Sequence, residues 1–191
     1  MRELVQWQKI DPSNGRVFPW FTHPFLQVLE RWDLYEKKVL EYGGGRSTAW
    51  WLDKCSNVVT IDHNLDWIRA IKQEVEECKL QDVWIPYYVP SKEGDDAIRD
   101  IYVKAGDKHG PYDIIVVDGI HRFECMLHGI ELLLERGGIL IVDNWHQDGF
   151  MCPACEELVR GYEGYIFPQE DHVDHHGNCW KTAYFIIPSE A

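Results

Sequence analysis

Three consecutive glycines stand where a main chain could approach a bound ligand closely. Gly43, Gly44 and Gly45 directly follow a short apolar run and precede a predicted helix. Because glycine has no Cβ atom, such a turn allows close contact between the backbone and a ligand. Ser47 or Thr48 can cap the helix that follows, and the free N–H groups at the start of this helix would face a polar or anionic group. Segment 41–47 is therefore a candidate cofactor turn.

An acidic residue follows at the spacing that a nucleotide site requires. Asp62 ends the next apolar run, about twenty residues after the glycines, where its carboxylate can accept hydrogen bonds from ribose hydroxyls. A dinucleotide fingerprint would have a third glycine at the position of Thr48. The pattern thus favours an adenosine cofactor over a nicotinamide dinucleotide. A glycine turn of purely structural use is the alternative.

A second group of polar residues lies at the ends of two later apolar runs. Asp118 ends one run, and Asp143 and Asn144 end the next. The carboxyl ends of neighbouring parallel strands converge on one crevice, and carboxylate and amide oxygens suit Mg²⁺, Ca²⁺ or Mn²⁺. Such an ion would acidify a substrate hydroxyl. In the alternative, Asp118 contacts only a cofactor, and the other two residues cap a loop.

His121 offers another way to activate a hydroxyl. It follows Asp118 at the predicted start of a helix, and an imidazole beside the crevice could act as a general base. A capping or surface role is the alternative for this histidine.

Cysteines and histidines gather near the C-terminus. Cys152 and Cys155 have the C-x-x-C spacing of zinc ligands. The further candidates are His172, His175, His176 and Cys179. A single C-x-x-C at this spacing matches no standard zinc finger. A structural zinc site and a helix start followed by a solvated loop both stay open.

Composition narrows the class of protein. The 191 residues, 45% of them hydrophobic, fit one globular domain over 1–191. The net charge of −13 disfavours nucleic acid, whose phosphates require a surplus of Lys and Arg. No run approaches the roughly 18–20 apolar residues of a membrane span, and the N-terminus lacks signal-peptide features. We expect a cytoplasmic protein, and a homo-oligomer stays open.

Apolar runs alternate with amphipathic stretches, and this pattern predicts the elements that position the site. The predicted strands are 39–41, 58–62, 83–88, 112–118 and 138–143, and the predicted helices between them are 64–80, 95–108 and 122–135. Several runs are apolar throughout, as strands covered on both faces should be. The alternation predicts an α/β fold with a doubly wound, mostly parallel sheet.

Both ends of the chain depart from this alternation. Residues 1–24 are predicted as an extended lead-in, with a helix over about 25–32 after it. Near the C-terminus a short helix at 152–162 precedes two strands at 165–167 and 183–187. This hairpin-like pair brings the expected number of strands to seven.

Taken together, the motifs resemble those of class I S-adenosylmethionine (SAM)-dependent methyltransferases, in particular the sugar and small-molecule O-methyltransferases. The segments that carry the resemblance are Lys38–Thr48, Val58–His63, Tyr112–His121, Gly137–Asn144 and Trp180–Ile187. They occur in the family's order and cover residues 25–188. The resemblance implies a Rossmann-like, seven-stranded sheet with an antiparallel C-terminal strand.

The resemblance also implies SAM as cofactor and O-methylation of a small-molecule or sugar hydroxyl. The implied cofactor-binding residues are Glu41, Gly43, Gly45, Ser47, Asp62, His63 and Asp118. Glu41 would hold the amino-acid part of SAM, Asp62 the ribose, and Asp118 would lie near the methionine moiety.

The group of Asp118, Asp143 and Asn144 resembles the metal site of catechol and caffeoyl-CoA O-methyltransferases. Asp118 and His121 are then the catalytic candidates, with Mg²⁺ or another divalent cation as a second cofactor. An NAD(P)-dependent oxidoreductase and an inactive methyltransferase-like binding protein are the alternatives to the methyltransferase.

Overall fold

The computed structural model describes residues 19–92, 94–145, 153–173, 177 and 179–190. Within these ranges seven strands pair into one sheet. The strands are β1 (Lys38–Tyr42), β2 (Asn57–Asp62), β3 (Trp84–Tyr88), β4 (Ile114–Val117), β5 (Gly138–Val142), β6 (Glu163–Val173) and β7 (Cys179–Ile187).

The strand order is β3-β2-β1-β4-β5-β7-β6. Strands β1 to β5 pair in parallel, and β7 runs antiparallel to both β5 and β6. The predicted doubly wound sheet with an antiparallel C-terminal strand is thus confirmed. Since the chain reverses its direction of winding after β3, the ends of β1 and β4 lie side by side at a switch point, where open α/β sheets bind ligands.

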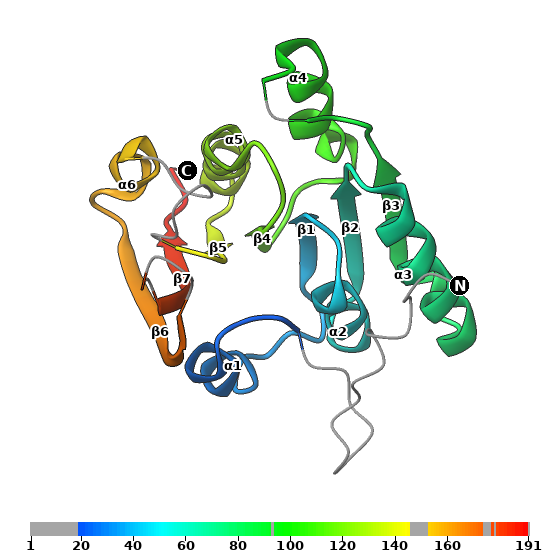
Figure 1. Cartoon of the computed structure of the whole chain (residues 1–191), viewed down its shortest axis with the longest axis horizontal. Coiled ribbons are helices and arrows are strands. Elements are labelled where there is room, and N and C mark those ends of the chain that lie inside the picture. Colours follow the sequence, from blue (N-terminus) through cyan, green and yellow to red (C-terminus); the bar gives the residue numbers. More distant parts are fainter. Residues whose placement is uncertain (1–18, 93, 146–152, 174–176, 178, 191) are drawn as a thin grey trace.

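Helices cover both faces of the sheet (Figure 1). They are α1 (His23–Leu29), α2 (Arg46–Lys54), α3 (Leu65–Cys78), α4 (Asp96–Lys104), α5 (Arg122–Leu134) and α6 (Pro153–Val159), with short 3₁₀ turns at Gln81–Val83 and Asp107–His109. Helices α1, α2 and α3 pack on one face, and α4, α5 and α6 on the other.

Alternate strand residues supply the two cores. Val39 and Ile114 face α1 to α3, whereas Leu40 and Ile115 face α4 to α6, and all four are buried. A parallel strand that is covered on both faces is mostly apolar. This coverage explains the continuous apolar runs of β1, β2 and β4.

Several boundaries differ from the predicted ones. Helix α4 ends at Lys104 rather than at 108, and β7 begins at Cys179 rather than at 183. Helix α1 spans 23–29 rather than 25–32, because Pro24 fits the first turn of a helix. Strand β4 is shorter than predicted. Strand β6 spans 163–173 rather than 165–167, since an edge strand needs only main-chain pairing with β7 and tolerates exposed residues and Pro168.

Candidate cofactor site

A pocket of about 250 Å³ opens at the carboxyl ends of β1, β2 and β4. The predicted site residues that line it are Gly43, Gly45, Ser47, Asp62, His63, Asp118 and Asn144. The structure thus brings together residues that are far apart in the sequence, from the ends of β1, β2, β4 and β5. The pocket is also lined by residues that sequence reasoning did not single out, namely Trp20, Arg46, Trp67, Gly119 and Arg122.

The glycine turn is held tightly between its neighbours. Gly43 has a φ of +92°, and a Cβ atom there would lie 2.5 Å from the main-chain nitrogen of Gly119. A Cβ atom on Gly44 would lie 2.8 Å from Thr60 Cγ2. Side chains are therefore excluded at both positions, and the backbone itself forms this wall of the pocket.

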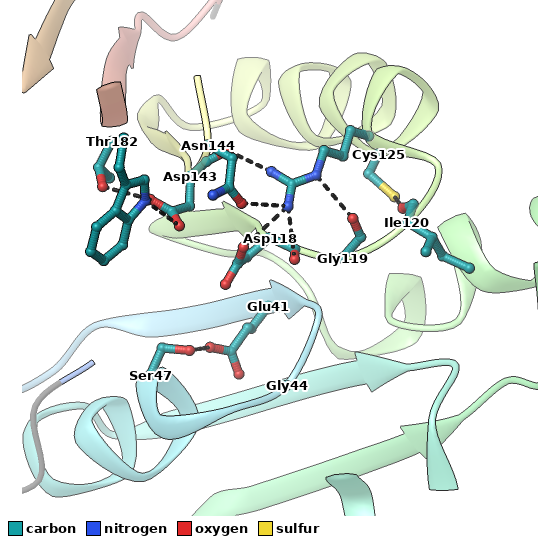
Figure 2. Close-up of polar contacts among 12 residues, drawn as sticks. Glu41, Gly44, Ser47, Asp118, Gly119, Ile120, Cys125, Asp143, Asn144 and Thr182 are labelled. Carbon is teal, nitrogen blue, oxygen red and sulfur yellow. Dashed lines mark hydrogen bonds and ion pairs between the residues drawn. The ribbon is translucent and has the colours of Figure 1, made fainter. Parts of the chain in front are cut away.

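Glu41 lies beneath the turn rather than on the pocket wall. Its side chain is fully buried and accepts hydrogen bonds from the hydroxyls of Ser47 (2.5 Å), Thr60 (3.2 Å) and Thr48. Figure 2 shows Glu41 and Ser47 pointing toward one another. Burial raises the pKa of Glu41 to about 8, although the hydroxyl donors oppose the shift. The geometry thus makes Glu41 an anchor for the turn.

Thr48 explains why the third glycine of a dinucleotide fingerprint is absent. Its hydroxyl donates to Glu41 and also accepts a hydrogen bond from the main-chain nitrogen of Gly45 (3.0 Å). With glycine at position 48, the Glu41 carboxylate and the Gly45 nitrogen would both lose the Thr48 hydroxyl as a hydrogen-bond partner.

Asp62 ends β2 with its carboxylate oriented by main-chain donors. Oδ2 accepts from the nitrogen of Gly44 (2.7 Å) and Oδ1 from that of Asn64 (2.6 Å). Burial raises the pKa of Asp62, while these N–H groups favour the charged form. Each carboxylate oxygen can accept more than one hydrogen bond. Asp62 is therefore oriented for a further hydroxyl donor.

Arg122, the first residue of α5, joins the ends of β4 and β5. It is 6% exposed, and its Nη2 donates to Asp118 Oδ1 (3.2 Å) and Asn144 Oδ1 (3.0 Å). The guanidinium also donates to the main-chain carbonyls of Asp118, Gly119 and Asp143. Figure 2 shows these contacts meeting between Asp118, Gly119 and Asn144.

The Asp143 carboxylate lies on the other side of its strand end. Oδ1 accepts from the hydroxyl of Thr182 (2.6 Å), and both oxygens lie 3.1 Å from the indole nitrogen of Trp180. Thr182 in turn accepts a hydrogen bond from the main-chain nitrogen of Thr22 (3.0 Å). Burial, together with the charge of Asp118, raises the pKa of Asp143 well above its usual range.

The three predicted metal ligands are therefore not arranged around a divalent ion in the way that the sequence predicts. Asp118 and Asn144 both face the guanidinium of Arg122, and the Asp143 carboxylate binds two donors on β7. Over the described ranges, no group of three or more His, Cys, Asp or Glu residues could hold a metal. Sequence reasoning missed Arg122, although a basic residue four positions after a strand-end aspartate was a visible signal.

His121 is placed beside the pocket but not on its wall. Its side chain is buried, Nε2 lies 2.7 Å from the hydroxyl of Ser91, and its ring packs edge-on against Tyr102. The imidazole thus connects the loop after β4 to the loop after β3. A general-base role stays a prediction that this geometry does not favour.

The zinc hypothesis falls largely outside the described residues, which omit Cys152, His175 and His176. Cys155 is 1% exposed within the core beside α5, and Cys179 begins β7. Cys155 thus packs in the apolar core as a small hydrophobic residue, which is the usual environment of a structural cysteine.

Comparison with known proteins places the fold. The sequence matches no protein-family model, and no curated protein matches it. Among solved structures, the O-methyltransferase TomG from Streptomyces achromogenes, in complex with SAM, is 17% identical with a TM-score of 0.60, over 97% of this chain and 90% of that chain.

The O-methyltransferase from Bacillus cereus, in complex with S-adenosylhomocysteine (SAH), is 18% identical with a TM-score of 0.61, over 96% and 90% of the two chains. A putative rRNA methylase from Clostridium thermocellum is 13% identical with a TM-score of 0.62, over 90% and 99%. The fold is that of the SAM-dependent methyltransferases. In the part of the chain described, no helix is long and apolar enough to cross a membrane.

Proposed function

We propose that the chain is a SAM-dependent methyltransferase that methylates an oxygen atom of a small molecule. The observation that carries the proposal is the pocket at the ends of β1 and β2, where a glycine turn without room for side chains faces the oriented carboxylate of Asp62. The fold supports the cofactor assignment, because solved structures with this fold contain SAM or SAH.

The residues that line the pocket fit the parts of SAM. Asp62 would accept hydrogen bonds from the ribose hydroxyls, and the main chain at 43–45 would lie along the methionine part. Asp118, whose Oδ1 meets Arg122, would face the ammonium group. Arg46 begins α2 and lines the same pocket, so its guanidinium and the N–H groups of the helix start suit the carboxylate.

SAM, when bound, supplies an electrophilic methyl group to a nucleophile. The contribution of the protein is then to hold acceptor and cofactor in line and to exclude water. Burial raises the pKa of Asp118 to about 6 although Arg122 favours the charged form, so this carboxylate is mostly ionised at pH 7. We propose that Asp118 holds the charged methionine part and that His121 positions the surrounding loops.

A second pocket adjoins the first and suits the acceptor. It measures about 550 Å³ and shares Trp20 and Arg46 with the cofactor pocket. Phe21 from the lead-in and Trp180 from β7 also line it. A pocket of this size with aromatic walls suits a small molecule that contains a ring. We propose that the methyl acceptor binds here.

An RNA acceptor or a nicotinamide dinucleotide cofactor would each require features that differ from those of this chain. RNA is the acceptor implied by the name of the Clostridium thermocellum protein, but the net charge of −13 opposes a polyanion. A nicotinamide dinucleotide would require glycine where Thr48 anchors Glu41. The TomG and Bacillus cereus proteins, both named as O-methyltransferases, support oxygen as the acceptor atom.

Calorimetric titration of the purified protein with SAH and with NADH tests the proposal. We expect SAH to bind and NADH not to bind. Asp62→Ala should weaken SAH at least about tenfold, because it removes hydrogen bonds to a charged acceptor. Asp66→Ala, which changes an exposed carboxylate on the first turn of α3, is the matched control and should bind SAH normally. Binding of NADH alone would support an oxidoreductase, and binding of neither would support a non-enzymatic role.

A further inference from the structure

Two residues other than glycine adopt the left-handed backbone conformation on either side of the Arg122 guanidinium. His121 and Asn144 both have a φ of +53°. This conformation is uncommon for residues with a side chain and has an energetic cost. His121 directly precedes Arg122, and Asn144 directly follows Asp143, whose carbonyl accepts from the guanidinium. Two strained turns thus lie beside the same side chain, that of Arg122.

The oxygens around Arg122 form a cage of the kind that usually holds a cation. The guanidinium lies among three main-chain carbonyl oxygens, one carboxylate oxygen and one amide oxygen. Oxygen donors of these types also bind divalent metals in proteins. A guanidinium presents five N–H groups in a planar fork. Nε and Nη1 each donate to one carbonyl, and the two hydrogens of Nη2 are shared among the other three acceptors.

The loop that Arg122 holds also forms a wall of the cofactor pocket. Gly119 lies so close to Gly43 that a Cβ atom on Gly119 would be 2.9 Å from the nitrogen of Gly43. Arg122 Nε donates to the carbonyl of this same Gly119 (3.0 Å). The guanidinium therefore fixes the position of the β4 loop against the glycine turn.

We infer that Arg122 is the resident cation at the ends of β4 and β5, in the place where the residue types had suggested a divalent metal. It positions the loop that carries Asp118 and Gly119 for cofactor binding, and this binding needs no divalent ion. Arg122 acts through these neighbours, so it is a positioning residue.

The first test uses the unmodified protein. SAH affinity should be the same after treatment with EDTA and after addition of Mn²⁺, and electron paramagnetic resonance should show no stoichiometric Mn²⁺ site. One equivalent of bound Mn²⁺ that disappears in Asp118→Asn would overturn the inference. This measurement does not depend on how well an Arg122 variant folds.

The second test is chemical rescue of Arg122→Ala. This variant should bind SAH at least about tenfold more weakly, since it loses several charge-assisted hydrogen bonds. Guanidinium ion, at concentrations too low to denature, should restore part of the affinity by entering the vacated cage. Urea, which has a similar shape but no charge, should not restore it, and Mn²⁺ should not either. Rescue by Mn²⁺ and not by guanidinium would overturn the inference.

Arg160→Ala is the matched control, because Arg160 pairs with Glu157 on the surface. This variant should leave SAH affinity unchanged. Thermal unfolding of Arg122→Ala with guanidinium, urea or Mn²⁺ gives a second readout that needs no SAH. If the unmodified protein does not bind SAH, the proposed function fails, while stabilisation of Arg122→Ala by guanidinium alone still supports the resident cation. Equal stabilisation of Arg122→Ala by guanidinium and by urea would contradict the inference that a cation is required here.

Discussion

At the ends of β1 and β2, buried carboxyl groups are held by hydroxyl and main-chain N–H donors, whereas at the end of β4 a carboxylate lies beside a guanidinium. Glu41 has three hydroxyl donors and a pKa near 8. Asp118 has Arg122 and a pKa near 6. Burial raises both pKa values, and only at Asp118 does a cation, Arg122, oppose the rise.

The two regions also differ in how far their partners lie along the chain. Glu41 bonds within seven residues to Ser47 and Thr48. At β5, Asp143 depends on Trp180 and Thr182, which follow it by 37 and 39 residues. The β1–β2 region is therefore a largely local structure, and the β4–β5 region is a junction between distant segments.

Gly43→Ala should have the largest effect, because it breaks the contact between the two regions. The new Cβ atom would meet Gly119, and the φ of +92° adds strain, so we expect a loss of about 2–4 kcal/mol in unfolding free energy and no detectable SAH binding. Denaturant unfolding and calorimetry measure these quantities.

Gly161→Ala separates the effect of backbone strain from that of the steric clash with Gly119. Gly161 has a φ of +100° but open space around its Cβ position, so this variant should lose only about 1–2 kcal/mol and bind SAH normally. Equal losses for the two variants would mean that the contact with Gly119 contributes nothing.

Thr182→Val tests the junction at β5. It removes the hydroxyl that donates to Asp143 and accepts from the nitrogen of Thr22, so two buried polar groups lose a partner, at a cost of about 1–3 kcal/mol. Thr182→Ser keeps the hydroxyl and should recover most of this stability in denaturant unfolding. A valine variant as stable as the serine variant would show that the lead-in is not tied to β5 through this residue.

The pH dependence of stability should distinguish the two carboxyl groups. A carboxyl whose pKa is raised on folding stabilises the folded state at low pH, and this contribution is lost as the pH rises through the folded-state pKa. For Glu41 the loss extends from about pH 4.5 to about pH 8, and for Asp118 it ends near pH 6. The slope can reach about 1.4 kcal/mol per pH unit for each group.

Between pH 6.5 and 8, Glu41→Gln should therefore flatten the stability curve, whereas Asp118→Asn should leave its slope unchanged. Urea unfolding at a series of pH values measures both slopes. An unchanged slope in Glu41→Gln over this interval would show that the hydroxyl donors keep Glu41 ionised.

The same contrast explains which parts of the fold and site were predictable. Strands β1 and β2, the glycine turn and Asp62 carry local signals, namely continuous apolar runs, missing side chains and a fixed spacing. For the strand-end carboxylates the local signal is weaker: Arg122 follows Asp118 by four residues, and nothing nearby in the sequence marks the partners of Asp143. Asp118 and Asp143 look alike in the sequence, but Arg122 sets the environment of one, and Thr182 that of the other.

Edge pairing and the lead-in were equally hard to predict. Strand β6 runs six residues further than expected, because its hydrogen bonds to β7 do not require apolar side chains. Trp20 reaches the pocket from a segment with no periodic pattern. Such contacts depend on tertiary packing, which local propensity does not encode.

The smallest expected effect concerns His121, and it decides between positioning and general-base catalysis. If the imidazole joins two loops through Ser91, a double-mutant cycle with His121→Ala and Ser91→Ala should give a coupling of about 0.5–1.5 kcal/mol in unfolding free energy. Each single variant should then weaken SAH by a similar, few-fold amount, because each releases the same contact between the loops. Catalysis as a general base would not require either variant to weaken SAH, because the base acts on the acceptor. Zero coupling, with normal SAH affinity in both variants, would therefore return His121 to the list of candidate bases.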